Sequence, residues 1–153
     1  MASGIRWRWR GRQPERWTGL PTAAKTALAV YAIGFLEGAA SHVQDLVAGG
    51  VDAYDWVSGP VQVLFYSLVV LDSLAVYLAV RAHPAVVPFG VAIMAADLPA
   101  NWHYNWAGVT AHPAHILYLT PMSLFGLFVA AAAVPLWQVL RRRAPWRATP
   151  DIS

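Results

Sequence analysis

Four long apolar stretches, separated by short polar segments, dominate the pattern of residues along this chain. A helix that crosses the hydrocarbon core of a bilayer needs about 20 mostly apolar residues. The stretches that approach this length cover residues 22–48, 61–80, 85–101 and 114–140. The pattern predicts an all-α fold, in which a polytopic membrane protein forms a bundle of four transmembrane helices.

The third stretch is the least regular of the four. Its apolar part ends near Asp97, and it contains Pro88 and Pro99. A proline inside a helix removes one backbone hydrogen bond and clashes with the preceding turn. We therefore expect this helix to be interrupted or bent near Pro99 and to end near residue 101.

The composition supports a membrane domain, and the placement of the basic residues predicts its orientation. Hydrophobic residues make up 58% of the chain and charged residues only 12%, whereas roughly a quarter of the residues in a soluble domain are charged. Most Lys and Arg residues lie in the predicted tails, 1–21 and 141–153, and the connection between the second and third spans carries Arg81. The connections at 49–59 and 102–112 carry none. Because Lys and Arg are enriched in cytoplasmic loops, we expect a multi-pass protein of the cell membrane with both termini in the cytoplasm (N-in/C-in).

The basic tails also indicate what the protein contacts. Each Lys or Arg near an anionic membrane surface contributes about 1 kcal/mol. The lipid bilayer, with its anionic headgroups at the two tails, is therefore the expected partner. Nucleic acid is not expected, since the basic residues flank apolar spans. Assembly into a homo-oligomer, or with other subunits of a membrane complex, stays open.

Several kinds of chemistry are missing from the sequence. The chain has no cysteine, which excludes disulfides, thiol nucleophiles and iron–sulfur clusters, and we expect no haem. The sequence also lacks a Gly-x-Ser-x-Gly nucleophile motif, a phosphate-binding Gly-rich loop and a His-Glu-x-x-His motif. A serine hydrolase and an ATP-driven pump are therefore disfavoured.

Four acidic residues fall inside the predicted spans. Glu37 and Asp45 lie in the first, Asp72 in the second and Asp97 in the third. Each ionisable group costs roughly 2.5–3.5 kcal/mol at the centre of an inserted helix, so such residues commonly mark a functional site. With both termini inside, all four lie between the middle of the membrane and its outer surface.

The phase of each helix indicates which polar groups share a face. Glu37, Ser41 and Asp45 lie on one face of the first span, and Asp97 and Asn101 on one face of the third. Asp72 lies off the polar stripe of the second span, so we expect it to contribute less. The candidate residues for binding a ligand or cation are Glu37, Ser41, Asp45, Asp72, Asp97 and Asn101.

Three interpretations of these residues stay open. The acids can form an outward-facing site for a proton, a cation or a small ligand, used in transport or sensing. They can instead join His42, His103, His112 or His115 in binding a divalent metal, as in a metal-dependent membrane enzyme. They can also be hydrogen-bonded groups that hold the helices together in a structural or accessory subunit with no substrate of its own. The sequence alone does not decide whether the protein is an enzyme.

Overall fold

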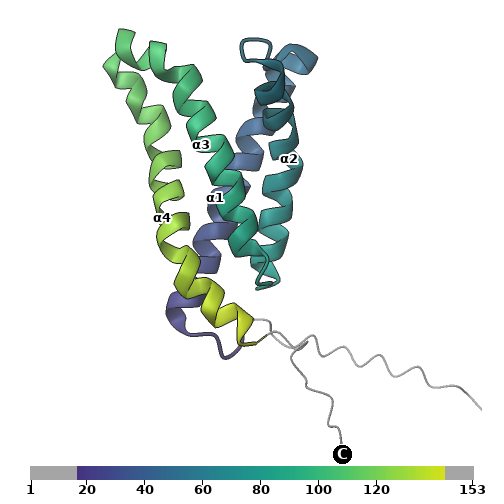
Figure 1. Cartoon of the computed structure of the whole chain (residues 1–153). Coiled ribbons are helices and arrows are strands. Elements are labelled where there is room, and N and C mark those ends of the chain that lie inside the picture. The colour runs from purple at the N-terminus through teal and green to yellow at the C-terminus, as the bar shows by residue number, and fades with distance from the viewer. Residues whose placement is uncertain (1–16, 144–153) are drawn as a thin grey trace, which may run out of the picture.

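The computed structural model describes residues 17–143, and every regular element in this part of the chain is helical. The four α-helices run alternately up and down (Figure 1). Their bounds, with two short 3-10 helices, are α1 Thr22–Gly49, η1 Gly50–Asp52, α2 Gly59–Val80, α3 Val86–Ala111, η2 Pro113–His115 and α4 Ile116–Arg141. Residues 1–16 and 144–153, which hold most of the predicted basic tails, lie outside the described residues.

The helices form two antiparallel pairs. α1 packs most extensively on α2, and α3 on α4, whereas α1 and α4 touch only slightly. The two pairs meet near the end that holds Thr22 and Arg141, here called the termini end, and diverge toward the distal end, which holds η1 and η2 (Figure 1). The two pairs therefore lie closest together near the termini end (Figure 1).

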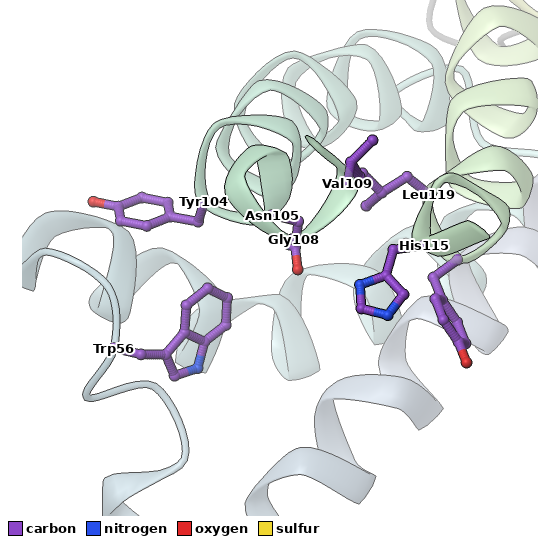
Figure 2. A pocket seen from close by; sticks show the side chains of 8 residues that line it. Trp56, Tyr104, Asn105, Gly108, Val109, His115 and Leu119 are labelled. Atoms are coloured by element: carbon purple, nitrogen blue, oxygen red, sulfur yellow. The ribbon is translucent and has the colours of Figure 1, made fainter. Parts of the chain in front are cut away.

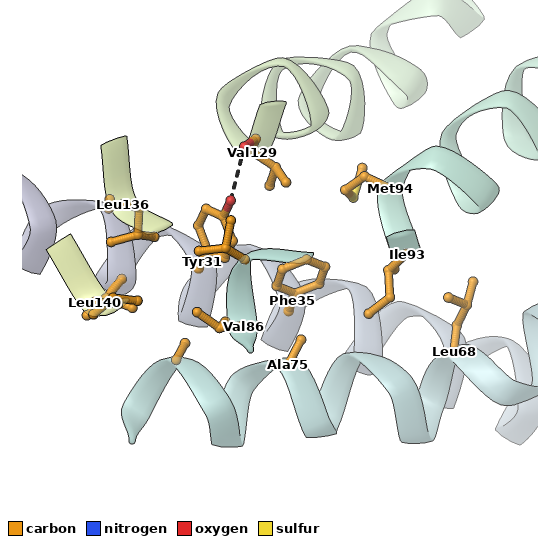
Figure 3. Close-up of a cluster of buried hydrophobic side chains, with 14 of the residues drawn as sticks. Tyr31, Phe35, Leu68, Ala75, Val86, Ile93, Met94, Val129, Leu136 and Leu140 are labelled. Carbon is orange, nitrogen blue, oxygen red and sulfur yellow. Dashed lines mark hydrogen bonds between the residues drawn. The ribbon is translucent and has the colours of Figure 1, made fainter. Parts of the chain in front are cut away.

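Buried residues recur every three or four positions along each helix, as expected for one face turned to a common core. Near the termini end this core is apolar, and the Tyr31 hydroxyl crosses it to donate a hydrogen bond of 3.0 Å to the Val129 carbonyl (Figure 3). Apart from tyrosine hydroxyls, Asp72 and Asp97 are the only buried polar side chains among the described residues. Both lie near the middle of their helices, α2 and α3.

The predicted all-α fold is confirmed, and most helix bounds agree closely with the prediction. The spans expected at 22–48, 61–80 and 114–140 correspond to α1, α2 and α4, with ends that differ by no more than two residues. These three helices, extended by the adjoining 3-10 turns, are long and apolar enough to cross a membrane, and α3 is not among the helices of the described region that meet this criterion.

The third helix differs from the prediction. α3 is one continuous helix through Pro99 and extends to Ala111, so most of the expected loop at 102–112 is helical. Pro99 removes only one backbone hydrogen bond, and contacts beyond it hold the helix in place. The Tyr104 hydroxyl donates to Ser58 Oγ at 2.7 Å, and the Trp102 indole donates to an α4 hydroxyl at 2.9 Å. These contacts stabilise the helix beyond Pro99.

Candidate functional site

One cavity of about 590 Å³ lies among the four helices, between the middle of the molecule and its distal end. α1 contributes half of its lining residues, and the other three helices contribute single residues or short stretches. We call it the acidic cavity. It is lined by all six residues predicted to bind a ligand or cation: Glu37, Ser41, Asp45, Asp72, Asp97 and Asn101.

Asp72 is the most deeply placed of these acids. Its side chain is only 4% exposed, and no described residue donates a hydrogen bond to its carboxyl group. The carboxyl group fits against the backbone of Gly38, where an added Cβ would lie 2.7 Å from Asp72 Oδ2. Asp97 and Glu37 lie close enough to repel a charge on Asp72. An isolated buried carboxylate is costly, so the state of Asp72 depends on what fills the cavity.

The neighbouring acids make only local hydrogen bonds. Asn101 Nδ2 donates to Asp97 Oδ1 at 2.8 Å, one helical turn away, and Ser41 Oγ donates to Glu37 Oε1 at 3.4 Å. A carboxylate has about four acceptor positions. Both acids therefore keep most of their acceptor capacity for a group in the cavity.

A tyrosine from the α1–α2 connection joins two polar residues at the distal end of α1. Tyr54 is 2% exposed, and its hydroxyl donates to Asp45 Oδ2 at 3.1 Å. The tyrosine oxygen also lies 2.9 Å from His42 Nδ1. Burial and the nearby Asp45 carboxylate raise the pKa of Tyr54 well above its usual value, so the phenol keeps its proton. Because that single proton goes to Asp45, His42 Nδ1 must be the donor to the tyrosine oxygen. This assignment leaves His42 Nε2 free to accept or donate.

The side of the cavity that α4 lines is apolar and aromatic. The Phe125 ring fills the space above Gly34, where an added Cβ would lie 2.3 Å from the ring, and it packs edge-on against Phe35 with centroids 5.0 Å apart. Met94 and Met122 lie beside them. The cavity therefore has one acidic side and one apolar side.

The charges that line the acidic cavity are unbalanced. It contains four carboxyl groups, and none of its lining residues is Lys or Arg. His42 is the only lining residue with a basic side chain. The electrostatic environment therefore attracts positive charge and repels anions.

A second cavity, of about 400 Å³, adjoins the first at the distal end. Its labelled side chains include Trp56, Tyr104 and His115 (Figure 2). Tyr118 and Leu119 line both cavities. An aromatic chamber thus lies next to the acidic cavity.

The four histidines named as metal-ligand candidates do not gather at one place. His42 lines the acidic cavity, whereas His103 packs against Tyr104, and His112 and His115 lie side by side at the distal tip with ring centroids 5.3 Å apart. The part of the chain that the structure describes holds no group of three or more His, Cys, Asp or Glu side chains arranged to bind a metal ion. The structure therefore gives the metal hypothesis no centre in this region.

Asp72 occupies a more central place than the phase argument expected. The polar stripe of α2 faces the connection and the surface: Gln62 donates to Asp55 at 2.9 Å, and the Tyr66 hydroxyl donates to the Val51 carbonyl at 2.5 Å. Asp72 instead belongs to the buried stripe of α2, which comprises Phe65, Leu68, Asp72, Ala75 and Ala79. The sequence did carry a signal for this position, because Asp72 is separated by three or four residues from apolar residues of the core on either side.

Sequence reasoning did not identify Tyr54, Phe125 or Met122 as site residues. Tyr54 lies in a connection whose path the sequence does not reveal, and the other two look like ordinary lipid-facing residues of an apolar helix. Comparisons with protein-family models, curated proteins and solved structures found no match to this chain.

Proposed function

We propose that this chain is an integral membrane protein that crosses the cell membrane four times and binds a cation in the acidic cavity, from the outer side. Support for membrane insertion comes from α1, α2 and α4 and from apolar side chains on the outside of the helices, such as Leu124 at 62% and Leu127 at 67% exposed. α3 has 26 residues and at 1.5 Å per residue is about 39 Å long, enough to cross a hydrocarbon core of about 30 Å.

The charges of the two ends support the N-in/C-in orientation. Every described Lys and Arg lies toward the termini end: Lys25, Arg81 and residues 141–143. Arg81 lies over the Tyr77 ring at 5.3 Å, and Arg141 over the Trp137 ring at 5.2 Å. Basic and aromatic residues together are typical of a membrane interface, and the basic excess favours the cytoplasmic side. The distal end, with the acidic cavity, then faces outward.

The observation that carries the proposal is the unpartnered carboxyl group of Asp72 in a cavity that holds three further acids and no Lys or Arg. A structural subunit that uses acids only to join helices would give each of them a hydrogen-bond donor. Asp72 has none among the described residues. A cation that enters the cavity would offset the cost of keeping these carboxylates away from water.

Binding from one side is favoured over conduction through the molecule. Between the acidic cavity and the termini end the described core is apolar, and the Tyr31 hydroxyl there is already used by the Val129 carbonyl. An ion path needs polar groups along its whole length. The proposed role is therefore a binding step, as in sensing or in the outward-open state of a transport cycle.

Tetramethylammonium is a suitable first probe, because it carries charge and cannot serve as a proton donor. The full chain in phosphatidylcholine nanodiscs should unfold at a higher temperature with this probe present, since a ligand at 100 times its Kd stabilises a protein by about 2.7 kcal/mol. The Glu37→Gln, Asp97→Asn double variant should lose most of this shift. Asp52→Asn, which removes a charge outside the cavity, should keep it. An equal shift in all three proteins would contradict the proposal.

A further inference from the structure

We propose that the ligand is an organic ammonium ion with an apolar body, which places its charged group among Glu37, Asp72 and Asp97 and its body against Phe125 and Met122. This inference rests on the proposed cation-binding function and adds the class of ligand. It follows from the size of the acidic cavity, the separation of its two walls and the place where it opens.

The cavity is too large for a bare ion. A water molecule takes up about 30 Å³ in the liquid, so a volume of about 590 Å³ corresponds to roughly 20 waters. Pockets for small organic molecules commonly have volumes of about 300–1,000 Å³. A metal ion or proton would leave most of this space to water, whereas an organic ligand would fill it.

The two walls differ in what they recognise. Carboxyl groups come from α1, α2 and α3, and the α4 side of the cavity supplies Phe125, Met122 and Leu119. A hydrated inorganic cation would leave the apolar side chains in contact with water, which is unfavourable. A molecule with an ammonium group at one end and a hydrocarbon or aromatic body at the other satisfies both walls.

The opening of the cavity also fits an amphiphilic ligand. Ile33 on α1 and Tyr118 on α4 line the cavity and are 69% and 82% exposed, and these two helices touch only slightly. In a membrane the gap between them would face lipid and would give the cavity a second opening beside the one toward the outer side. Tyr118 also borders the aromatic chamber, where Trp56 and Tyr104 offer ring faces to a passing cation.

Three probes of matched chemistry test this proposal. 4-Phenylbutylammonium has both the charge and the apolar body, 4-phenylbutan-1-ol has the body without the charge, and tetramethylammonium has the charge without the body. Each would be titrated into the full chain in phosphatidylcholine nanodiscs, with empty nanodiscs as the blank for partitioning into lipid. We expect 4-phenylbutylammonium to bind at least about tenfold more tightly than either of the other two, a difference of 1.4 kcal/mol or more.

Two pairs of variants test the acidic side and the apolar side of the cavity separately. Asp72→Asn should reduce the preference for the amine over the alcohol to about threefold or less, while Asp52→Asn leaves it unchanged. Phe125→Ala should weaken amine and alcohol alike and leave tetramethylammonium unchanged. Phe128→Ala, three residues along α4 and outside the cavity, is the matched control and should change neither. If Phe125→Ala misfolds, Phe125→Leu tests the same wall with less loss of volume.

The outcomes distinguish failure of the inferred ligand class from failure of the proposed cation-binding function. If tetramethylammonium binds as tightly as 4-phenylbutylammonium, and both depend on the acids, the cavity binds cations but the inferred ligand class is wrong. If 4-phenylbutan-1-ol binds as tightly as the amine, the class is likewise wrong. If binding of both cations is indifferent to Glu37, Asp72 and Asp97, cation binding itself is overturned.

Discussion

Replacing Asp72 with asparagine should change stability and binding in opposite directions. Asparagine has nearly the same shape as aspartate but no charge, so the packing against Gly38 is kept. Asp72 is 4% exposed and receives no hydrogen bond from any described residue, and a buried polar group without a partner costs about 1–3 kcal/mol, more when charged. Removing the charge should therefore leave the free energy of unfolding unchanged or raise it by up to about 2 kcal/mol.

The same change should weaken cation binding. Tetramethylammonium donates no hydrogen bond, so the loss is that of a charge–charge interaction. At an effective dielectric constant of about 20, two opposite charges roughly 6–10 Å apart attract by about 1.5–3 kcal/mol, which corresponds to about a 10- to 150-fold loss of affinity. Stability would be measured by SDS-induced unfolding in mixed micelles, followed by tryptophan fluorescence, and affinity by calorimetry in nanodiscs. A loss of stability above about 1 kcal/mol, with affinity unchanged, would show that Asp72 is a structural group and would refute this reasoning.

Two further predictions concern the surroundings of the acids. Gly38→Ala keeps every carboxyl group but places a Cβ 2.7 Å from Asp72 Oδ2. It should therefore weaken tetramethylammonium binding and lower the free energy of unfolding by up to about 2 kcal/mol. Gly59→Ala, where an added Cβ meets open space, should do neither in the same assays. Because burial and the neighbouring Asp45 carboxylate raise the pKa of Tyr54 above its usual value of 10.0, its contribution to stability is complete below that pH and is lost above it. We would measure the free energy of unfolding of the wild type and of Tyr54→Phe from pH 9 to 12. The wild-type value should fall more steeply with pH, by up to about 1.4 kcal/mol per pH unit. Equal slopes for the two proteins would contradict the role given to the phenol.

The helices were predictable because their signal is local. An apolar run of about 20 residues is itself the property that drives insertion and helix formation in lipid, so α1, α2 and α4 could be bounded within two residues. α3 was harder, since its continuation past Pro99 depends on Tyr104 and Trp102 meeting Ser58 and an α4 hydroxyl. Such contacts between distant segments leave no periodic trace in the sequence.

The acid set of the cavity was predictable for a different reason. Charged groups inside apolar spans are so costly that each one stands out, and all six candidates line a single cavity. The position of Asp72 was harder to predict, because it shares a face with the apolar core residues of α2 and not with the polar stripe of that helix. The aromatic wall was not predictable, because Phe125 facing a cavity and a phenylalanine facing lipid have the same sequence pattern.

The central claim, an acidic cavity that opens to the outer side, has one direct test. The chain has no native cysteine, so Ser41→Cys, in the cavity lining, would carry the only thiol, and its reaction in intact cells with a cationic and an anionic methanethiosulfonate can be compared. At an effective dielectric constant of about 20, two charges roughly 8 Å apart interact by about 2 kcal/mol. We predict that the cationic reagent reacts at least about tenfold faster, which needs only about 1.4 kcal/mol, and that adding Glu37→Gln lowers this ratio. Thr110→Cys, exposed at the distal end of α3 and outside the cavity lining, should show no such preference. Equal rates for the two reagents at residue 41, or no reaction from outside the cell, would contradict the account.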